Sequence, residues 1–298
     1  MSLNHAPRAS ARTTRLIGRL DEIADGYDAV LCDLWGCYHD GIRPFPAAVA
    51  ALTSYRARGG IVVLLTNAPR PPASVARFLD AMGAPKDSYD AIMSSGGACQ
   101  RAIASGTLGR RFHYVGPERD RHMLAEIGFD DTPAAQADAI LCTGFEDDTR
   151  QTPADYDPHI ASWRARGLRL VCANPDIVVD RGHERLWCAG AIAQRYAEAG
   201  GEVIWFGKPH RPTYEQSMAL VAELAGREIA PERVLGIGDG ILTDVKGALD
   251  FGIDALFVSG GLAAAEVGAD PDHPDAARLG NWLAERGQSP QFAIGRLR

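Results

Sequence analysis

The sequence predicts an α/β protein built on a doubly wound parallel sheet. Short, continuous apolar runs alternate with longer amphipathic segments along the chain, and continuous runs indicate parallel strands that are buried on both faces. Polar residues with useful chemistry follow directly after several of these runs. With 298 residues, the chain is long enough for two domains or one large one.

The predicted elements follow from these patterns in chain order. The apolar runs that predict strands lie at residues 29–32, 61–65, 91–93, 139–142, 168–173, 203–206, 234–237 and 255–258. The patterns that predict helices lie at residues 47–58, 74–82, 189–199, 213–225 and 243–251. Pro231 and Glu232 are typical of a helical first turn just before the run at 234. Near the start, Arg12, Arg15 and Arg19 stand at helical spacing and predict an amphipathic first helix.

Polar side chains at the ends of the apolar runs predict the functional edge of the sheet. Asp33 follows the first run, Thr66 and Asn67 follow the second, Lys208 follows the run at 203, and Asp239 follows the run at 234. In an open parallel sheet the carboxyl ends of the strands face one edge, where ligands bind. We therefore expect these side chains to lie together.

The stretch at residues 97–183 differs in character from the rest of the chain. It is rich in Asp, Pro and Thr, and its runs end in no equivalent Lys or Asp. We predict that it is an inserted second domain, with residues 1–96 and 184–298 forming the two parts of the core domain.

Composition limits the classes of partner. The 38 acidic and 31 basic residues give a formal net charge of −7, which argues against binding nucleic acid through phosphate neutralisation. No apolar run approaches the roughly 18 residues needed to span a bilayer. The N-terminus lacks a signal-peptide pattern, and none of the six cysteines forms a C-x-x-C pair. We expect a cytoplasmic protein with buried, reduced thiols.

The residues at the strand ends suit phosphoryl transfer to a carboxylate. An aspartate such as Asp33 can attack phosphorus and form an acyl-phosphate, and a hydroxyl such as Thr66 can hold a phosphate oxygen. Carboxylates such as Asp239 and Asp244 repel one another unless a hard cation intervenes, and Mg²⁺ binds such groups together with phosphate oxygens. Lys208 can neutralise developing negative charge. Any one aspartate here could simply cap a helix. The occurrence of all these residues in this order, each after an apolar run, favours a catalytic site instead.

Five motifs carry a resemblance to a known family. They read VLCDLWG at 30–36, LLTN at 64–67, ANPD at 173–176, GKP at 207–209 and GDGILTD at 238–244. This pattern resembles the haloacid-dehalogenase-like (HAD) superfamily, specifically class IIA phosphatases of the p-nitrophenyl-phosphatase and N-acetylglucosamine-operon type. The resemblance implies a Rossmann-like core with an inserted α/β cap, and Mg²⁺-dependent hydrolysis of a small phosphomonoester such as a sugar phosphate.

The resemblance also assigns catalytic and metal-binding roles. It implies that Asp33 is the nucleophile and first Mg²⁺ ligand, and that Lys208 steadies Asp33 and the phosphate. Asp239 would ligate Mg²⁺, with Asp244 acting just outside the ligand shell. The backbone carbonyl of Trp35 would be a further metal ligand.

Substrate contacts are implied in the same way. Thr66 would bind the phosphoryl group with help from Asn67, and Lys208 would contact the phosphate. Asn174 and Asp176 would lie near the substrate in the cap, although the same residues are compatible with a simple turn around Pro175. The partner is expected to be a small phosphorylated metabolite, and a homodimer through the cap stays open.

Trp35 departs from the family pattern. The resemblance implies an Asp at this position that protonates the leaving alcohol, and a tryptophan cannot do this. Losing a positioned acid or base lowers a rate on the order of 10²–10⁴-fold. Three explanations stand side by side: a substitute such as His39, Asp40 or an acid of the insert; a leaving group that needs no proton; or a protein that binds phosphate esters with little turnover.

Three other classes of function were weighed against a phosphatase. The Gly236–Gly240 loop is similar to a dinucleotide-binding turn, but Ile241 stands where the third glycine belongs, and Asp239 would repel pyrophosphate. Carbon–halogen hydrolysis tolerates an aromatic at Trp35 but needs no metal. A non-catalytic sensor or scaffold would bind phosphate esters without hydrolysing them.

Overall fold

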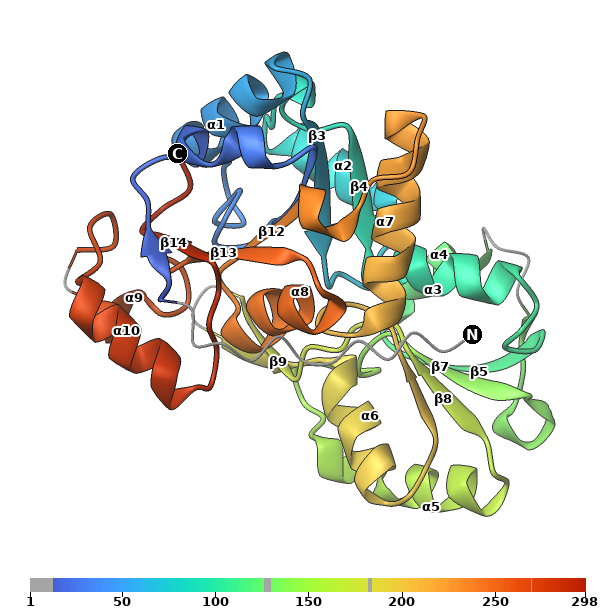
Figure 1. The fold of residues 1–298 in the computed structure, drawn as a ribbon. Coiled ribbons are helices and arrows are strands. Elements are labelled where there is room, and N and C mark those ends of the chain that lie inside the picture. Colours follow the sequence, from blue (N-terminus) through green and yellow to red (C-terminus); the bar gives the residue numbers. More distant parts are fainter. Residues whose placement is uncertain (1–12, 126–129, 182–183, 269) are drawn as a thin grey trace, which may run out of the picture.

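The computed structural model describes residues 13–125, 130–181, 184–268 and 270–298, and it divides them between two parallel sheets (Figure 1). The larger sheet has seven strands in the order β1-β14-β13-β12-β2-β3-β4. Their bounds are β1 Arg15–Leu16, β14 Phe292–Ile294, β13 Asp254–Val258, β12 Val234–Gly238, β2 Ala29–Asp33, β3 Ile61–Thr66 and β4 Ala91–Ser94. We call this sheet and its helices the core.

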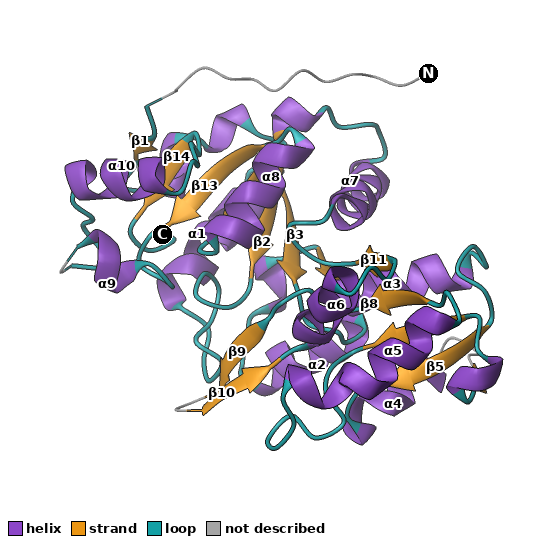
Figure 2. Ribbon diagram, turned by 90° about the horizontal axis from the view of Figure 1, so that it is seen from below, coloured by secondary structure: helices purple, strands orange, loops and turns teal. Residues whose placement is uncertain are grey.

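The second sheet has five parallel strands in the order β11-β8-β7-β5-β6. Their bounds are β11 Val203–Trp205, β8 Arg169–Cys172, β7 Ala139–Cys142, β5 Arg111–Val115 and β6 Asp130–Asp131. An antiparallel hairpin of β9 (Val178–Arg181) and β10 (Glu184–Trp187) projects from it (Figure 2). We call residues 111–205, which hold this sheet and hairpin, the cap.

Ten α-helices accompany the strands in the described residues. They are α1 Pro46–Ala57, α2 Pro72–Ala81, α3 Ser95–Ala104, α4 Glu118–Ala125, α5 Asp157–Ala165, α6 Ala189–Glu198, α7 Arg211–Ala225, α8 Lys246–Phe251, α9 Ala264–Val267 and α10 Ala276–Glu285. Their ends follow local chemistry. The Ser94 hydroxyl accepts a hydrogen bond from the Gly97 N–H to begin α3, and α7 ends at Gly226 in the left-handed conformation.

Alternating residues of the core strands face opposite layers, as a doubly wound sheet requires. Val30 of β2 packs in the layer with Leu52 of α1 and Leu79 of α2. Its neighbour Leu31 packs in the layer with Tyr214 of α7. The predicted fold class is therefore confirmed, and helices cover both faces of the sheet (Figure 2).

The predicted end of the insert at residue 183 does not match the pairing of strands. β11 aligns Val203 with Leu170 of β8, so the run at 203 belongs to the second sheet and not to the core. Ile192 of α6 packs with Trp163 in the same cluster as β7 and β8. We therefore place the end of the insert after β11. The prediction missed this boundary because a short apolar run does not specify which of two sheets its strand joins.

The predicted amphipathic first helix is wrong where the structure describes it. Arg15 and Leu16 form strand β1, which pairs with β14 at the edge of the core sheet, and Arg12 lies outside the described residues. The Thr14 hydroxyl donates to the Pro290 carbonyl at 2.8 Å and extends this pairing. All six cysteines are buried and free. Among the described helices, none has the length and apolar character needed to cross a membrane.

Candidate active site

The polar residues predicted at the strand ends meet at one edge of the core sheet. β12, β2 and β3 are adjacent parallel strands, so their carboxyl ends present Asp239, Asp33 and Thr66 side by side. All three side chains are buried. They line a cavity of about 810 Å³ that cap residues also line, and we call it the active-site cavity. Its size is within the range of small-molecule sites.

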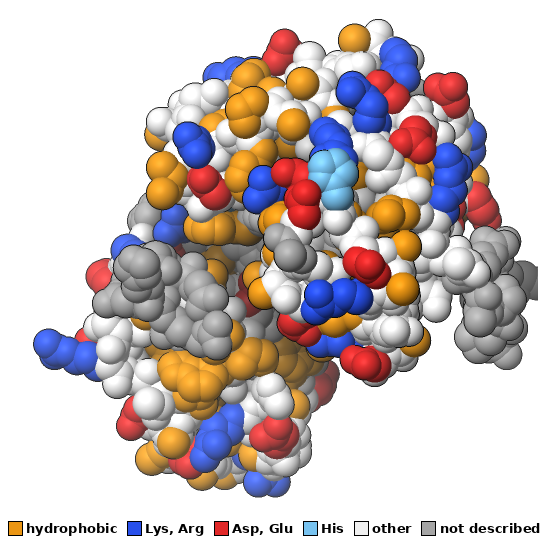
Figure 3. Space-filling model, turned by 90° about the vertical axis from the view of Figure 1, so that its left-hand side faces the viewer, with side chains coloured by type: hydrophobic (Ala, Val, Ile, Leu, Met, Phe, Trp, Pro, Cys, Tyr) orange, Lys and Arg blue, Asp and Glu red, His pale blue; other side chains and the backbone are white. Residues whose placement is uncertain are grey.

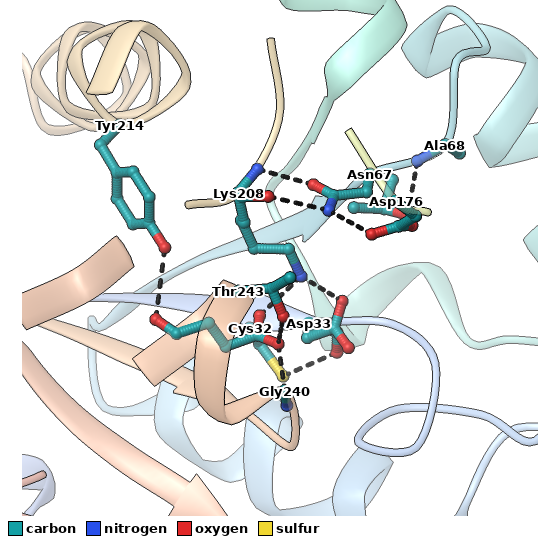
Figure 4. Close-up of polar contacts among 11 residues, drawn as sticks. Cys32, Asp33, Asn67, Ala68, Asp176, Lys208, Tyr214, Gly240 and Thr243 are labelled. Carbon is teal, nitrogen blue, oxygen red and sulfur yellow. Dashed lines mark hydrogen bonds and ion pairs between the residues drawn. The ribbon is translucent and has the colours of Figure 1, made fainter. Parts of the chain in front are cut away.

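Lys208 joins two of the carboxylates at this edge. It follows β11, and only 3% of its surface is exposed. Its Nζ lies 2.5 Å from Asp33 Oδ1 (Figure 4) and 2.6 Å from Asp244 Oδ1. Burial opposes the charge on Lys208, but Asp244 and Asp33 outweigh that effect and raise its pKa well above the ordinary value. Lys208 is therefore a fixed cation, and it leaves Asp33 Oδ2 without this contact.

Asp239 contributes a carboxylate that no lysine or arginine pairs with in the described part of the chain. Its Oδ2 accepts a hydrogen bond of 2.9 Å from the Leu262 N–H. Gly36 and Gly261 lie so close that a Cβ on either would stand 2.1 Å from Asp239 Oδ2. Burial first, and then the charge of Asp244, raise the pKa of Asp239 to about 7. The close approach of two backbone segments thus confines an unneutralised carboxylate.

These carboxylates fit a hard divalent cation. Side-chain ligand atoms of Asp33, Asp239 and Cys37 lie within 4.8 Å of one another. Burial raises the pKa of Asp33 well above its ordinary value; Lys208 opposes that shift, and Asp244 and Asp239 reinforce it. A bound cation would relieve this cost, and carboxylate oxygens are ligands that Mg²⁺ prefers. Burial and the nearby carboxylates raise the pKa of Cys37, which keeps it a neutral thiol.

Asp244 is held by the chain itself. It lies in the turn Ile241–Val245 that leads into α8. Its Oδ1 contacts Lys208, and its Oδ2 accepts hydrogen bonds from the Gly240 N–H at 3.1 Å and the Thr243 hydroxyl at 3.2 Å. Both oxygens of Asp244 are thus already engaged, which suits a residue that positions Lys208 beside the cation site.

Asn67 links the core to the cap loop that holds Asp176. Its Nδ2 donates to Asp176 Oδ1 at 2.8 Å and to the Lys208 carbonyl at 3.0 Å, and its Oδ1 accepts from the Lys208 N–H at 2.7 Å (Figure 4). The Asn174 Oδ1 accepts the Asp176 N–H at 3.1 Å. Asn174 therefore stabilises a local turn, while both cap residues also line the active-site cavity. The Thr66 Oγ1 accepts a long hydrogen bond of 3.3 Å from Ala68 N–H.

The loop after Asp33 holds Trp35, which stands where the resemblance implies a general acid, and His39, one of the proposed substitutes for that acid. Trp35 lines the cavity, and 46% of its side chain is exposed. His39 also lines the cavity but is fully buried; its Nδ1 accepts the Gly41 N–H at 3.0 Å, and its Nε2 has no hydrogen-bond partner among the described residues. Burial lowers the pKa of His39 to about 4, so the ring is neutral at pH 7. Asp40 instead caps its own loop through the Ile42 and Arg43 N–H groups, outside the cavity lining.

Several cavity residues were not singled out from the sequence. The Leu262 N–H, Phe78, and the hairpin residues Val178 and Trp187 all belong to the site or its lining. Two short apolar runs, at residues 177–179 and 186–188, flank a polar stretch that contains Gly182, but nothing local indicates that the hairpin faces Asp33.

Comparison with known proteins gives the family. A model of haloacid dehalogenase-like hydrolases matches residues 30–130, and a HAD-hydrolase-like model matches residues 205–280. The chain is 40% identical to a haloacid dehalogenase-like hydrolase of known structure from Brucella suis 1330. That match covers 95% of this chain and 100% of the other, with a TM-score of 0.80. The chain belongs to the haloacid dehalogenase-like hydrolases.

Two curated members of this hydrolase family show how widely its relatives differ. The 5'-nucleotidase YutF of Bacillus subtilis is 23% identical over 264 residues, which cover 86% of this chain and 98% of that protein. The D-glycerol 3-phosphate phosphatase of Mycobacterium tuberculosis is 28% identical over 254 residues, which cover 83% and 67% of the two chains. One is thus named as a nucleotidase and the other as a glycerol phosphate phosphatase.

Proposed function

We propose that this HAD-like hydrolase is a Mg²⁺-dependent phosphatase that hydrolyses a small phosphomonoester through an aspartyl-phosphate on Asp33. The observation that carries this proposal is the buried arrangement of three carboxylates around one ammonium. Lys208 contacts Asp33 and Asp244, whereas in the part of the chain that the structure describes Asp239 accepts only the Leu262 backbone N–H. With three carboxylates and one ammonium, the site has an excess of acidic groups that can bind a divalent cation. A bound cation would then attract the phosphate of a substrate.

The residues suggest roles in a two-step displacement. Asp33 attacks phosphorus with the oxygen that Lys208 leaves free; a P–O bond forms to Asp33, and the bond to the leaving oxygen breaks. Thr66 and Lys208 hold phosphoryl oxygens. Water then cleaves the acyl-phosphate, so that inorganic phosphate departs and the Asp33 carboxylate returns. If Asp33, Asp239 and the Trp35 carbonyl hold Mg²⁺, the cation would supply positive charge that stabilises negative charge on the phosphoryl oxygens during transfer.

The test is phosphate release from a panel of phosphomonoesters with Mg²⁺ and with EDTA. Wild-type protein is expected to release phosphate only with the metal, and Asp33→Asn is expected to lose activity by about 10³-fold or more, as when a nucleophile is removed. Asp250→Asn is a matched control, because Asp250 is exposed and pairs with Lys246 far from the cavity lining. Metal-independent release, or full activity of Asp33→Asn, would refute the proposal.

A second candidate rests on Trp35. Because an indole cannot protonate a leaving alcohol, the protein could bind phosphate esters and turn them over weakly or not at all. Tight Mg²⁺-dependent binding of a phosphate ester, with no phosphate released from any member of the panel, would favour this candidate. The cytoplasmic location and the cap-mediated dimer stay predictions.

A further inference from the structure

The part of the active-site cavity beyond the carboxylates has a largely apolar wall. Trp35, Phe78, Val178, Val179, Trp187 and Leu262 all line it and are all partly exposed. Trp35 and Leu262 come from loops of the core, and Phe78 comes from α2. The other three residues belong to the cap hairpin, so the wall is assembled from both halves. In the space-filling view, hydrophobic side chains gather on both sides of the hollow between the two halves (Figure 3).

Trp35 presents a fixed aromatic face in this wall. A Cβ on Gly41, whose φ is +89°, would stand 2.3 Å from the indole, so the indole lies directly against a position where only glycine fits. The His39 ring packs edge-on against the indole, with 5.1 Å between ring centroids. Contacts on these sides leave nearly half of Trp35 open to the cavity, and a ring that is already positioned loses little entropy on binding.

The cap hairpin supplies a second aromatic side chain. Trp187 of β10 stands opposite Val178 of β9 in the antiparallel ladder, so these two side chains share one face of the hairpin. Trp187 is 38% exposed, although tryptophan usually buries its large apolar surface in a core or an interface. The exposed area therefore indicates a surface that a ligand covers.

Several polar side chains elsewhere in the lining are already paired within the protein, although His39 Nε2 has no partner among the described residues. Arg119 forms an ion pair with Asp148, and Arg70 Nε lies 3.7 Å from Asp120 Oδ1. The Thr143 hydroxyl shares a hydrogen bond of 2.9 Å with the Tyr114 hydroxyl. A polyhydroxy leaving group would have to give up hydration here and compete for several groups that are already paired, which disfavours it.

We propose that the leaving group of the substrate carries an aromatic ring, which lies against Trp35 and Trp187 while the phosphate meets Asp33. This inference rests on the phosphatase function proposed above and names the class of its substrate. A ring joined directly to the ester oxygen would also account for the absent acid at position 35. A phenol-type oxygen, with a pKa of about 10 as in free tyrosine, can leave as the anion when its bond to phosphorus breaks. The ring can be joined to the ester oxygen directly or through a short carbon chain.

The first test separates ring recognition from leaving-group acidity. Benzyl phosphate and glycerol phosphate both release an alkoxide, and only the first carries a ring. We expect kcat/KM to be at least about tenfold higher for benzyl phosphate, the size of one aromatic contact. Equal or better use of glycerol phosphate would overturn the inference while leaving the phosphatase function intact. Phenyl phosphate and adenosine monophosphate then distinguish a ring on the ester oxygen from a ring carried by a nucleoside.

Binding measurements keep the inference testable if no ester is hydrolysed. Phenylphosphonate and methylphosphonate share a phosphonate head, and calorimetry with Mg²⁺ present compares their affinities without any turnover. The inference predicts at least about tenfold tighter binding of phenylphosphonate. Equal affinities would refute ring recognition, whatever the catalytic result.

Variants locate the effect in the wall. Trp187→Ala is expected to lower the ratio of kcat/KM for benzyl phosphate to that for glycerol phosphate by about tenfold, mainly through KM, and Trp187→Phe is expected to restore much of it. Leu224→Ala is the control, because Leu224 is an apolar side chain on α7, 41% exposed and outside the cavity lining. If the Trp187→Ala protein is well folded and its ratio of kcat/KM for the two esters is unchanged, Trp187 does not recognise the ring.

Discussion

Lys208 Nζ lies 2.5 Å from Asp33 Oδ1, although 175 residues separate the two in the chain. Asp33 ends a strand of the core, and Lys208 follows the last strand of the cap. The backbone of Lys208 is held in addition by both ends of the Asn67 amide. The ion pair therefore fixes the junction between core and cap at the same point at which it prepares the proposed nucleophile.

Removing the lysine should damage stability as well as activity. Lys208→Met leaves Asp33 and Asp244 without their shared cation in a buried site, and breaking a buried pair in this way typically costs about 3–5 kcal/mol. Urea unfolding without added metal measures this loss. Lys246→Met is the matched control, because Lys246 forms an exposed helical pair with Asp250 and should change stability by less than about 1 kcal/mol. Similar losses in the two variants would contradict a structural role for the buried pair.

Stabilisation by Mg²⁺ should depend on pH. The pKa of Asp239 is raised to about 7 in the folded protein, so the folded state binds this proton more tightly than the unfolded chain does. The contribution of this group to stability is therefore present below pH 4 and is lost as the pH rises toward about 7. Because a divalent cation needs the ionised carboxylate, the increase in Tm caused by Mg²⁺ should be larger at about pH 8 than at about pH 6.

Differential scanning at the two pH values, with Mg²⁺ and with EDTA, checks this expectation. Asp239→Asn should lose most of the Mg²⁺ effect at both pH values, because it removes the ligand without removing the side-chain volume. A Mg²⁺-induced shift in Tm that is the same at both pH values in the wild type would contradict the proposed role of Asp239.

Restoring an acid at position 35 should broaden the substrate range. Trp35→Asp supplies a carboxyl group two residues after Asp33 and removes an aromatic face from the cavity wall. Turnover of an alkyl ester such as glycerol phosphate should rise by about 10²-fold or more, the usual worth of a positioned acid, and the preference for ring-bearing esters should fall. Steady-state kinetics on both ester types measures the change. No gain for the alkyl ester would contradict the idea that the missing acid at position 35 limits turnover.

Gly41, which contacts Trp35, should matter for ester selectivity as much as Trp35 itself. Gly41→Ala forces a side chain into a left-handed backbone and into the Trp35 ring, so it should lower both stability and the preference for ring-bearing esters. Gly280→Ala is a suitable control, since a Cβ there meets nothing within 4 Å in α10 and alanine favours a helix by up to about 1 kcal/mol. Thermal unfolding and kinetics compare the two. Unchanged ester selectivity in Gly41→Ala would argue that the position of Trp35 does not matter.

The strand-end residues could be predicted from the sequence because their signal is local. Asp33, Thr66 and Asp239 each follow directly after an apolar run, and adjacent parallel strands bring such positions to one edge. The doubly wound fold follows from the same pattern. The choice of strand partner is not local, which explains why the run at 203 predicts a core strand although β11 joins the cap sheet.

The cavity wall could not be predicted for a related reason. Trp187 and Val178 form an ordinary hairpin pattern, and only the tertiary fold turns that hairpin toward the cavity that Asp33 lines. Burial of His39 and the confinement of Asp239 by Gly36 and Gly261 likewise depend on backbone segments that lie far apart in the sequence. The residue types at the strand ends were enough to predict phosphoryl transfer. The proposed substrate selectivity depends on how distant segments pack around the cavity, which the sequence does not show directly.

The most direct test of the account is to detect the phosphorylated enzyme itself. Protein mixed with Mg²⁺ and a turned-over phosphomonoester is quenched in acid within milliseconds to seconds, and peptide mass spectrometry locates any added phosphoryl group. The account predicts one phosphoryl group on Asp33, dependent on Mg²⁺, labile to hydroxylamine as an acyl-phosphate is, and absent from Asp33→Asn. Phosphate release without any label on Asp33, or a label on another residue, would contradict the central claim.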